Sequence, residues 1–443
     1  MGVGAFLEPL IVVSLLAGGT IINRDRPGSG RRRTYEKGIR SSSSSPKRSF
    51  AGDALEAESA RRWSGDDDSS VPLSPWSAGS GGSSTTLLSQ GDDDLGPKWR
   101  HRTLKLWKWE KKVITPNTEV FEDRILSRVL RRLPFLVEAW YWALIYWVYQ
   151  VGRAIGALAM DETTVDVARR HALQLVHLEQ KLHVFVEKPV QQWFLQHATL
   201  MRWTNRAYSF IHIPGSILFL VVFYYLTTTR PRKIAQGTLP TKASSSPNRA
   251  GWRAQGRSTL NPALYEQRRR TMAMCNLFAF VIFTLWPCMP PRLLSDPNYA
   301  GPDAKEAKSY GFIDTVHGAD GESSVWTTNK FCNQYAAMPS LHFGYSLLIG
   351  LTVATMPVQF RGWRRAALAV GGMTYPTLIL TAIVATANHF VLDAVAGACV
   401  VAVAWHAQGI MLNLLVLEDY FLRLVRIHKP SKEMPGSKDM SIE

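Results

Sequence analysis

The sequence predicts an all-α integral membrane protein: a six-helix transmembrane core bundle with one extra N-terminal transmembrane anchor and interfacial amphipathic helices. Apolar runs long enough to cross a hydrocarbon core of about 30 Å recur along the 443 residues. The net charge of +16 is divided unevenly between the polar segments that join these runs, as in membrane proteins with basic cytosolic loops. These patterns exclude a fully disordered chain and an ordinary soluble enzyme.

The N-terminal part divides into three segments. Residues 1–22 predict a transmembrane anchor with its N-terminus outside the cytosol, because arginines follow the apolar run, the reverse of the order in a secretory signal. Residues 23–98 are rich in Ser, Gly, Asp and Arg and predict a disordered cytosolic linker. Residues 99–133 interleave basic with apolar and aromatic residues. They predict a basic amphipathic juxtamembrane segment on an anionic membrane surface rather than a nucleic-acid site, since an apolar run follows at once.

The remaining apolar runs predict one membrane domain over residues 134–415, followed by a cytosolic tail at 416–443. Between the first two runs, residues 161–206 mix apolar and charged positions and predict one or two amphipathic helices at the interface. His171, His177 and His183 in that stretch recur every six residues and so share no helix face, which argues against a metal site. The six runs are 134–153, 208–227, 272–290, 341–357, 366–386 and 391–415.

The charges of the connecting segments predict the topology. The connection at 228–271 and the turn at 358–365 are strongly basic, which places them in the cytosol with the linker and the tail. The loop at 291–339 holds more acidic than basic residues and is predicted to be lumenal or extracellular. Cys288 and Cys332 flank this loop and could form a disulfide if it faces an oxidising compartment.

Two stretches place histidines at ends of the predicted membrane helices. His389 and Asp393 are four residues apart, so on a helix the carboxylate lies within hydrogen-bonding reach of the imidazole, fixes its tautomer and stabilises its cation. Ser340 is a candidate N-cap for the helix that carries His342 in its first turn. The unpaired N–H groups at such a helix start favour a phosphate.

Both stretches begin on the same side of the membrane, because one apolar run leaves that side and the next returns to it. His342, His389 and Asp393 can therefore converge. Either histidine alone is readily explained as an interfacial anchor or an interhelical hydrogen bond. Two histidines, an aspartate in phase and a helix start suited to phosphate, all on one side, favour phosphoryl chemistry instead.

The chain resembles the type 2 phosphatidic acid phosphatase superfamily of membrane lipid phosphatases and phosphotransferases. Pro339-Ser340-Leu341-His342 resembles its second motif and His389-x-x-x-Asp393 its third. The wider sequence is similar to the inositol phosphorylceramide synthase-like branch, and the resemblance covers about residues 134–415. The similarity to this branch rests on Trp286-Pro287, on residues 290–294 and 311–315, on residues 333–342 and on residues 387–389.

The resemblance implies a role for each residue of these motifs. His389 attacks phosphorus, Asp393 orients His389, His342 protonates the leaving oxygen and Ser340 contacts the phosphate, with no metal and no other cofactor. Residues implied as further parts of the substrate loop are Asp314, Asn333, Tyr335 and Asn388.

The sequence departs from the superfamily's pattern in its cations. The superfamily's first motif, a lysine six residues before an Arg-Pro pair, is absent from this chain. Members of the superfamily also carry an arginine six residues before the nucleophilic histidine, and this chain has Ile383 at that position. Arg292, at the end of the third core helix, is the candidate replacement that binds the phosphate. The alternative is an arginine that snorkels toward lipid headgroups. The absences fit a transferase better than a plain phosphatase, and they also leave room for a lost activity.

The sequence thus predicts a multi-pass enzyme of the endoplasmic reticulum or Golgi whose catalytic face is lumenal. Its partners are membrane lipids, a phospholipid donor and a lipid alcohol acceptor, and not nucleic acid. The first hypothesis is transfer of a phospho-headgroup, such as phosphoinositol, to an alcohol such as ceramide through a phosphohistidine. One alternative is a lipid phosphate phosphatase that uses water, and another is a non-catalytic membrane scaffold or lipid-binding protein.

Overall fold

The computed structural model describes residues 4–25, 98–158, 162–208, 212–235, 260–301, 303–315, 334–358, 360 and 362–430, and this part of the chain is mostly helical. Predictions that fall wholly or largely outside it are the linker at 23–98, the second cysteine of the proposed disulfide, Cys332, the substrate-loop residue Asn333, and the last residues of the tail.

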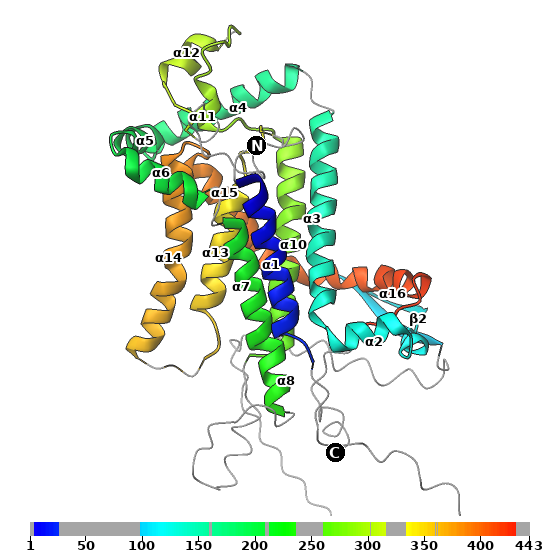
Figure 1. The fold of residues 1–443 in the computed structure, drawn as a ribbon. Helices are drawn as coiled ribbons and strands as arrows, with labels where there is room; N and C mark the ends of the chain where they lie inside the picture. The colour runs from blue at the N-terminus through cyan, green and yellow to red at the C-terminus, as the bar shows by residue number, and fades with distance from the viewer. Residues whose placement is uncertain are drawn as a thin grey trace, which may run out of the picture.

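Long helices lie side by side in a bundle that fills the centre of Figure 1. The six apolar runs of the sequence fall on six of these helices, and the N-terminal run falls on α1. In chain order the helices are α1 (Gly4–Ile22), α3 (Phe135–Leu158), α7 (His212–Tyr224), α10 (Pro262–Leu285), α13 (Leu341–Ala354), α14 (Trp363–Ala385) and α15 (Val391–Ala407).

Within the described residues, three helices are long and apolar enough to cross a membrane: His212–Ile234, Trp363–Ala385 and Val391–Leu424. The first of these is α7 continued through a π-helical turn, η4 (Tyr225–Thr229), into α8 (Arg230–Ala235). The last is α15 continued through η5 (Gln408–Leu414) and α16 (Leu415–Leu424). The protein is therefore an integral membrane protein.

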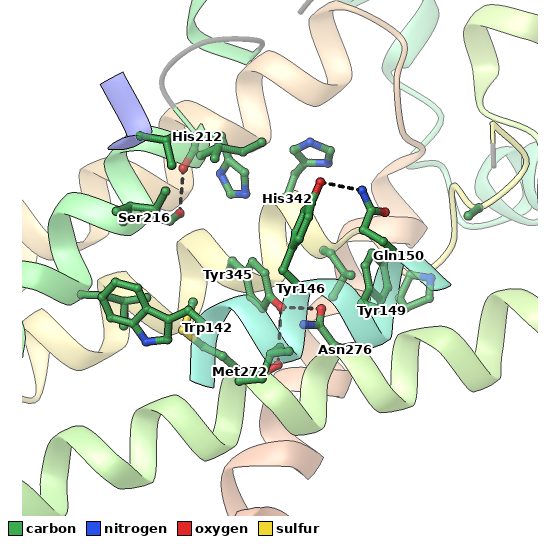
Figure 2. Close-up of a pocket in the computed structure, with 18 of the residues that line it drawn as sticks. Trp142, Tyr146, Tyr149, Gln150, His212, Ser216, Met272, Asn276, His342 and Tyr345 are labelled. Atoms are coloured by element: carbon green, nitrogen blue, oxygen red, sulfur yellow. Dashed lines mark hydrogen bonds between the residues drawn. The ribbon is translucent and has the colours of Figure 1, made fainter. Parts of the chain in front are cut away.

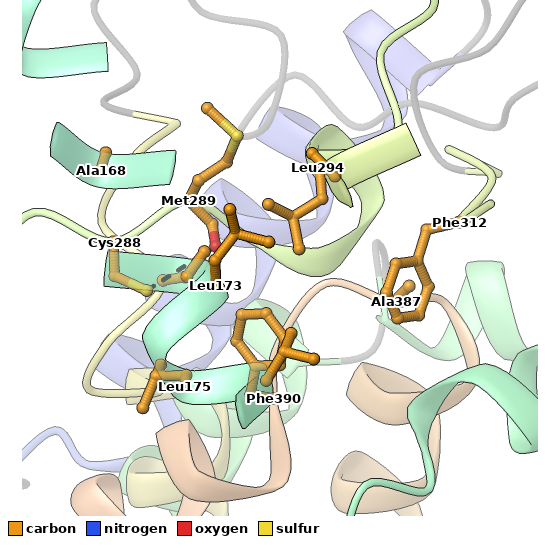
Figure 3. Packing of buried hydrophobic residues seen from close by; sticks show 13 residues of the cluster. Ala168, Leu173, Leu175, Cys288, Met289, Leu294, Phe312, Ala387 and Phe390 are labelled. Atoms are coloured by element: carbon orange, nitrogen blue, oxygen red, sulfur yellow. Dashed lines mark hydrogen bonds between the residues drawn. The ribbon is translucent and has the colours of Figure 1, made fainter. Parts of the chain in front are cut away.

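A layer of short helices covers one end of the bundle (Figure 1). The stretch at 161–206 forms three helices rather than one or two, namely α4 (Glu162–Lys181), α5 (Glu187–Leu195) and α6 (Ala198–Arg206). With them lie α11 (Pro291–Leu294) and α12 (Ala304–Ser309). The apolar face of α4 is buried, and Ala172, Leu173 and Val176 pack into the cluster that also holds Phe390 (Figure 3). This layer is what covers the start of α15.

The all-α prediction is wrong at residues 99–116, which form an antiparallel hairpin of β1 (Trp99–Leu106) and β2 (Trp109–Pro116). Aromatic and β-branched residues are frequent in this stretch and suit a pleated strand. Leu106 faces Trp109 across a two-residue turn, where Trp107 has φ of 56°, as such tight turns require. After the hairpin come η2 (Glu119–Phe121) and α2 (Ile125–Arg132).

The hairpin is attached to α16, so this part of the predicted tail belongs to the folded structure. Asp419 on α16 is buried, and its carboxylate accepts hydrogen bonds from Arg100, Arg102 and the hydroxyl of Thr115. Two arginines offset the cost of burying one carboxylate. The hairpin and α16 lie at the side of the bundle, far from the layer of α4–α6 (Figure 1).

Small residues set the close contacts among α13, α14 and α15. A Cβ at Gly350 would lie 2.7 Å from the carbonyl oxygen of Gly372, so only glycine lets α13 and α14 approach this far. A Cβ at Gly397 would collide with the carbonyl oxygen of Ser340. The start of α13 is therefore held against the first turns of α15, which brings the two histidine stretches together.

Candidate active site

His389 immediately precedes the start of α15, where its ring is fixed by two acceptors. Its Nδ1 lies 2.8 Å from the carbonyl oxygen of Ala337 and 3.4 Å from Oδ2 of Asp393. A carbonyl oxygen can only accept, so Nδ1 carries the hydrogen and Nε2 keeps its lone pair. Asp393 also accepts the N–H of the N-cap residue Phe390 at 2.9 Å. The arrangement leaves an imidazole with a nucleophilic Nε2 and a carboxylate that stabilises its cation.

The start of α13 supplies the second histidine. Ser340 is the N-cap, fully buried, and its hydroxyl accepts the N–H of Phe343 at 3.4 Å. Its own backbone N–H donates to the carbonyl oxygen of Asp393 at 2.9 Å, which ties the starts of α13 and α15 together. The ring of His342 then lies 5.6 Å, centroid to centroid, from the ring of His389. A phosphorus atom placed between the rings could be attacked by one and have its leaving oxygen protonated by the other.

Arg292 on α11 is 8% exposed, so it does not snorkel toward headgroups. Its Nε donates to Oδ1 of Asn388 at 3.0 Å, its Nη1 donates to Oδ2 of Asp314 at 2.6 Å, and its backbone N–H donates to the carbonyl oxygen of Ala387 at 2.9 Å. These contacts hold the guanidinium beside the residue that precedes His389. Among the described residues, Nη2 makes no hydrogen bond and is the donor left for an anion.

A cavity of about 600 Å³ extends from these residues into the bundle between α1, α3, α7, α10 and α13. His342, His389 and Arg292 line its polar end, and its walls are mostly apolar. Figure 2 shows the rings of His212 and His342 at one end and Trp142 and Met272 toward the other. The lining reaches Arg269 near the opposite end of α10, a depth of about 20 Å at about 1.5 Å per residue. An acyl chain would fit along such a wall.

Comparison with protein-family models gives one match, in two pieces, over residues 173–241 and 258–407, to the PAP2 superfamily. The chain carries a PAP2 superfamily domain. The match includes Ser340, His342, His389 and Asp393. The superfamily implies an enzyme of the phosphatase or phosphotransferase type that acts on lipid phosphates. Comparisons with curated proteins and with solved structures gave no match.

The PAP2 match does not extend to α1, the hairpin or α3, although α1 and α3 line the cavity. Val12 and Leu16 of α1 contribute to its wall. Farther along α1, a Cβ at Gly19 would lie 2.9 Å from the ring of Phe135 on α3 and 3.0 Å from Val221 on α7. The N-terminal helix therefore packs between α3 and α7 and closes that side of the cavity of the PAP2 domain.

The remaining predicted substrate-loop residues have different surroundings. Asp314 and Asn388 both contact Arg292 and so belong to the site. Tyr335 packs against the hydrophobic cluster around Cys288, and its neighbour Gln334 lines the cavity instead. Asn333 lies outside the described residues.

Sequence reasoning missed one residue of the PAP2 domain's site, His212. It is the first residue of α7, it is buried, and its ring lies 4.9 Å from that of His342. Its Nδ1 is 3.0 Å from the hydroxyl of Tyr375 on α14, and Tyr208 covers another side of His342 at 4.8 Å. The signal was available, because His212 stands near the start of an apolar run whose beginning is predicted on the same side as His342 and His389.

Proposed function

We propose that the protein is a multi-pass membrane lipid phosphotransferase, which moves a phospho-headgroup such as phosphoinositol from a phospholipid to a lipid alcohol such as ceramide. The observation that carries the proposal is the meeting of His342 and His389 at the polar end of a deep, mostly apolar cavity. A reaction between two lipids needs apolar room beside the reacting phosphorus, and this cavity supplies it. The superfamily match supports the lipid phosphate as the reacting group.

In the first half-reaction, Nε2 of His389 forms a bond to phosphorus while the bond from phosphorus to the diacylglycerol oxygen breaks. His342 donates the proton that this oxygen needs, and diacylglycerol leaves. The carbonyl oxygen of Ala337 keeps the hydrogen on Nδ1, and the carboxylate of Asp393 stabilises the positive ring.

In the second half-reaction, His342 takes the proton from the hydroxyl group of the acceptor lipid. The hydroxyl oxygen bonds to phosphorus as the bond to Nε2 breaks, so His389 is restored. Arg292 and the N–H groups at the start of α13 stabilise the charge on the equatorial oxygens, and the buried Ser340, as the N-cap, holds that helix start in place.

The membrane arrangement that suits this chemistry is a core of α3, α7, α10, α13, α14 and α15, with α1 as a further span. The ends of α3 and α10 that this arrangement places near the cytosol carry charged residues, which are costly inside a membrane. The buried Glu138 of α3 is paired with Arg269 of α10 at 2.7 Å. Paired charges near a helix end are compatible with a membrane span. The acidic balance of the loop at 291–339 supports a non-cytosolic catalytic end, for which we propose the lumen of the endoplasmic reticulum or Golgi.

The test uses the full chain in nanodiscs with labelled phosphatidylinositol, with and without ceramide. The proposal predicts ceramide-dependent formation of inositol phosphorylceramide and of diacylglycerol in equal amounts. Both products should disappear in His389→Ala and persist in His406→Ala, a matched control on the exposed far part of α15. Release of free inositol phosphate alone would assign a phosphatase that uses water. Full function of both His342→Ala and His389→Ala in cells would instead assign a scaffold.

A further inference from the structure

Two glutamates from the covering layer bind the first turn of α15. Oε1 of Glu179, on α4, accepts the N–H of Leu392 at 2.8 Å, and Oε1 of Glu187, on α5, accepts the N–H of Val391 at 2.7 Å. Both side chains are fully buried. The first N–H groups of a helix have no partner within the helix, so these carboxyls satisfy two of them. The residues bound are the second and third after His389.

Three carboxyls therefore converge on one helix start, since Asp393 already accepts the N–H of Phe390. A helix start commonly has a single polar cap from its own chain. Burying further carboxyls is costly, even when they face the positive end of a helix dipole. These buried carboxyls bind the helix turn that directly follows His389.

One oxygen of each carboxyl, Oε2, is buried and has no hydrogen-bond partner among the described residues. The two glutamates are also close enough for each to affect the pKa of the other. Burial, followed by the negative charge of Glu187, raises the pKa of Glu179 to about 9. Burial likewise raises the pKa of Glu187. The raised pKa of both groups, together with two buried Oε2 atoms that have no hydrogen-bond partner among the described residues, favours a proton held between the carboxyls at neutral pH.

The other groups around the pair do not replace that proton. Asp393 on α15 adds negative charge and raises the pKa of both glutamates. Burial keeps the thiol of Cys288 protonated by raising its pKa. Arg292, on α11 beside α4, is paired with Asp314, and Lys188, next to Glu187 on α5, donates to the carbonyl oxygen of Gly311. Loss of the shared proton would thus leave uncompensated charge at the start of α15.

We infer that Glu179 and Glu187 are positioning residues that share one proton and hold the first turn of α15 so that Nε2 of His389 faces His342. The inference rests on the proposed function, in which His389 is the nucleophile. It adds a dependence on pH. The protonated pair is the competent form, so activity is present below the raised pKa and is lost as the pH rises through it.

The experiment compares wild type, Glu179→Gln, Glu187→Gln and Glu179→Ala in nanodiscs over about pH 6 to 10. A glutamine still accepts the helix N–H and donates to the remaining carboxyl, so it mimics the protonated acid. Both glutamine variants should keep kcat at neutral pH and lack the alkaline decline of the wild type. Glu179→Ala, which leaves the N–H of Leu392 without its acceptor, should lower kcat by about 10- to 100-fold at nearly constant KM.

A second measurement is independent of turnover. Diethyl pyrocarbonate modifies unprotonated histidine nitrogens, and the exposed His406 on α15 gives an internal reference rate. The rate of modification of His389, divided by that of His406, should change severalfold in Glu179→Ala. In the wild type it should change when the pH rises above the pKa of Glu179. It should stay constant with pH in both glutamine variants.

The outcomes separate the two proposals. If no variant, wild type included, transfers or hydrolyses lipid phosphate, the proposed function fails while the relative rate at His389 still reports the positioning. If Glu179→Ala keeps the wild-type kcat and relative rate, the pair only joins α4 and α5 to the bundle, and the inference is overturned. An alkaline decline that is unchanged in both glutamine variants overturns it as well.

Discussion

Replacing Asp393 by asparagine tests how the ring of His389 is held. The structure gives Nδ1 two acceptors, the carbonyl oxygen of Ala337 at 2.8 Å and Asp393 at 3.4 Å. The nearer acceptor, the backbone carbonyl oxygen of Ala337, is unchanged by the substitution, so the hydrogen of His389 stays on Nδ1. What is lost is the attraction between a carboxylate and the positive charge that develops on the ring during attack.

The size of that loss follows from the distance. Unit charges 3.4 Å apart attract by about 5 kcal/mol at an effective dielectric constant of about 20. If about half of the ring's charge has developed in the transition state, the loss is about 2.5 kcal/mol, or about 70-fold in kcat. This is far below the loss of about 10,000-fold found where an aspartate alone fixes the tautomer of a catalytic histidine.

The assay is lipid phosphotransfer in nanodiscs, with kcat and KM measured for wild type, Asp393→Asn and Asp393→Ala. The asparagine can still accept the N–H of Phe390, so its melting temperature should stay close to that of the wild type. The alanine variant also loses this cap, at a cost of about 1 kcal/mol of stability. A kcat of Asp393→Asn within twofold of the wild type would contradict the electrostatic role. A loss near 10,000-fold would show that Ala337 does not hold the tautomer.

Three further tests, one of them with a matched control, address Arg292, the contact between α13 and α15, and the hairpin. Arg292→Lys should lower kcat/KM by about 10- to 100-fold, because an ammonium cannot serve both Asn388 and Asp314 and still face a phosphate; unchanged kinetics would remove this residue from the site. Gly397→Val should lower both the melting temperature and kcat, since its side chain meets the carbonyl oxygen of Ser340, whereas Gly371→Val, with open space around it, should change neither. Asp419→Ala should increase hydrogen exchange in the hairpin, because the contacts of Arg100 and Arg102 with the buried carboxylate are lost, and transferase activity should be retained. An unchanged exchange rate would contradict the attachment of the hairpin to α16 through Asp419.

The meeting of the two histidines and the aspartate could be predicted because its signals are local. The spacing of four residues predicted the contact between His389 and Asp393, although His389 precedes α15 and does not lie on it. One pair of apolar runs returns the chain to the side of His342. The run lengths also predicted helices where α13, α14 and α15 lie. His212 could have been found by the same reasoning on helix ends.

The partners of the site could not be predicted because they lie far away in sequence. Glu187 meets Val391 across 204 positions, and Glu179 meets Leu392 across 213. Nothing near either glutamate distinguishes it from an exposed acid on an amphipathic helix. Arg292 is the phosphate-binding candidate that the sequence predicts, but its contacts depend on how α11 turns back beside Asn388.

The hairpin was missed for a different reason. Basic and aromatic residues in 99–116 suit a helix on a membrane surface as well as a strand, and composition does not separate the two. The tight turn at Trp107 and the partner carboxylate of Asp419, 317 positions from Arg102, decide in favour of strands. The turn is a local feature of the sequence, whereas the contact with Asp419 could not be predicted from neighbouring residues.

The most direct test of the proposed mechanism is detection of the covalent phosphohistidine intermediate. The full chain would be mixed with phosphatidylinositol labelled in its phosphate, without acceptor, quenched in alkali and digested, and the labelled peptide identified by mass spectrometry. The proposed mechanism requires a phospho-headgroup on Nε2 of His389 that is lost when ceramide is added before the quench. Label on any other residue, or transfer to ceramide with His389 replaced by alanine, would contradict it.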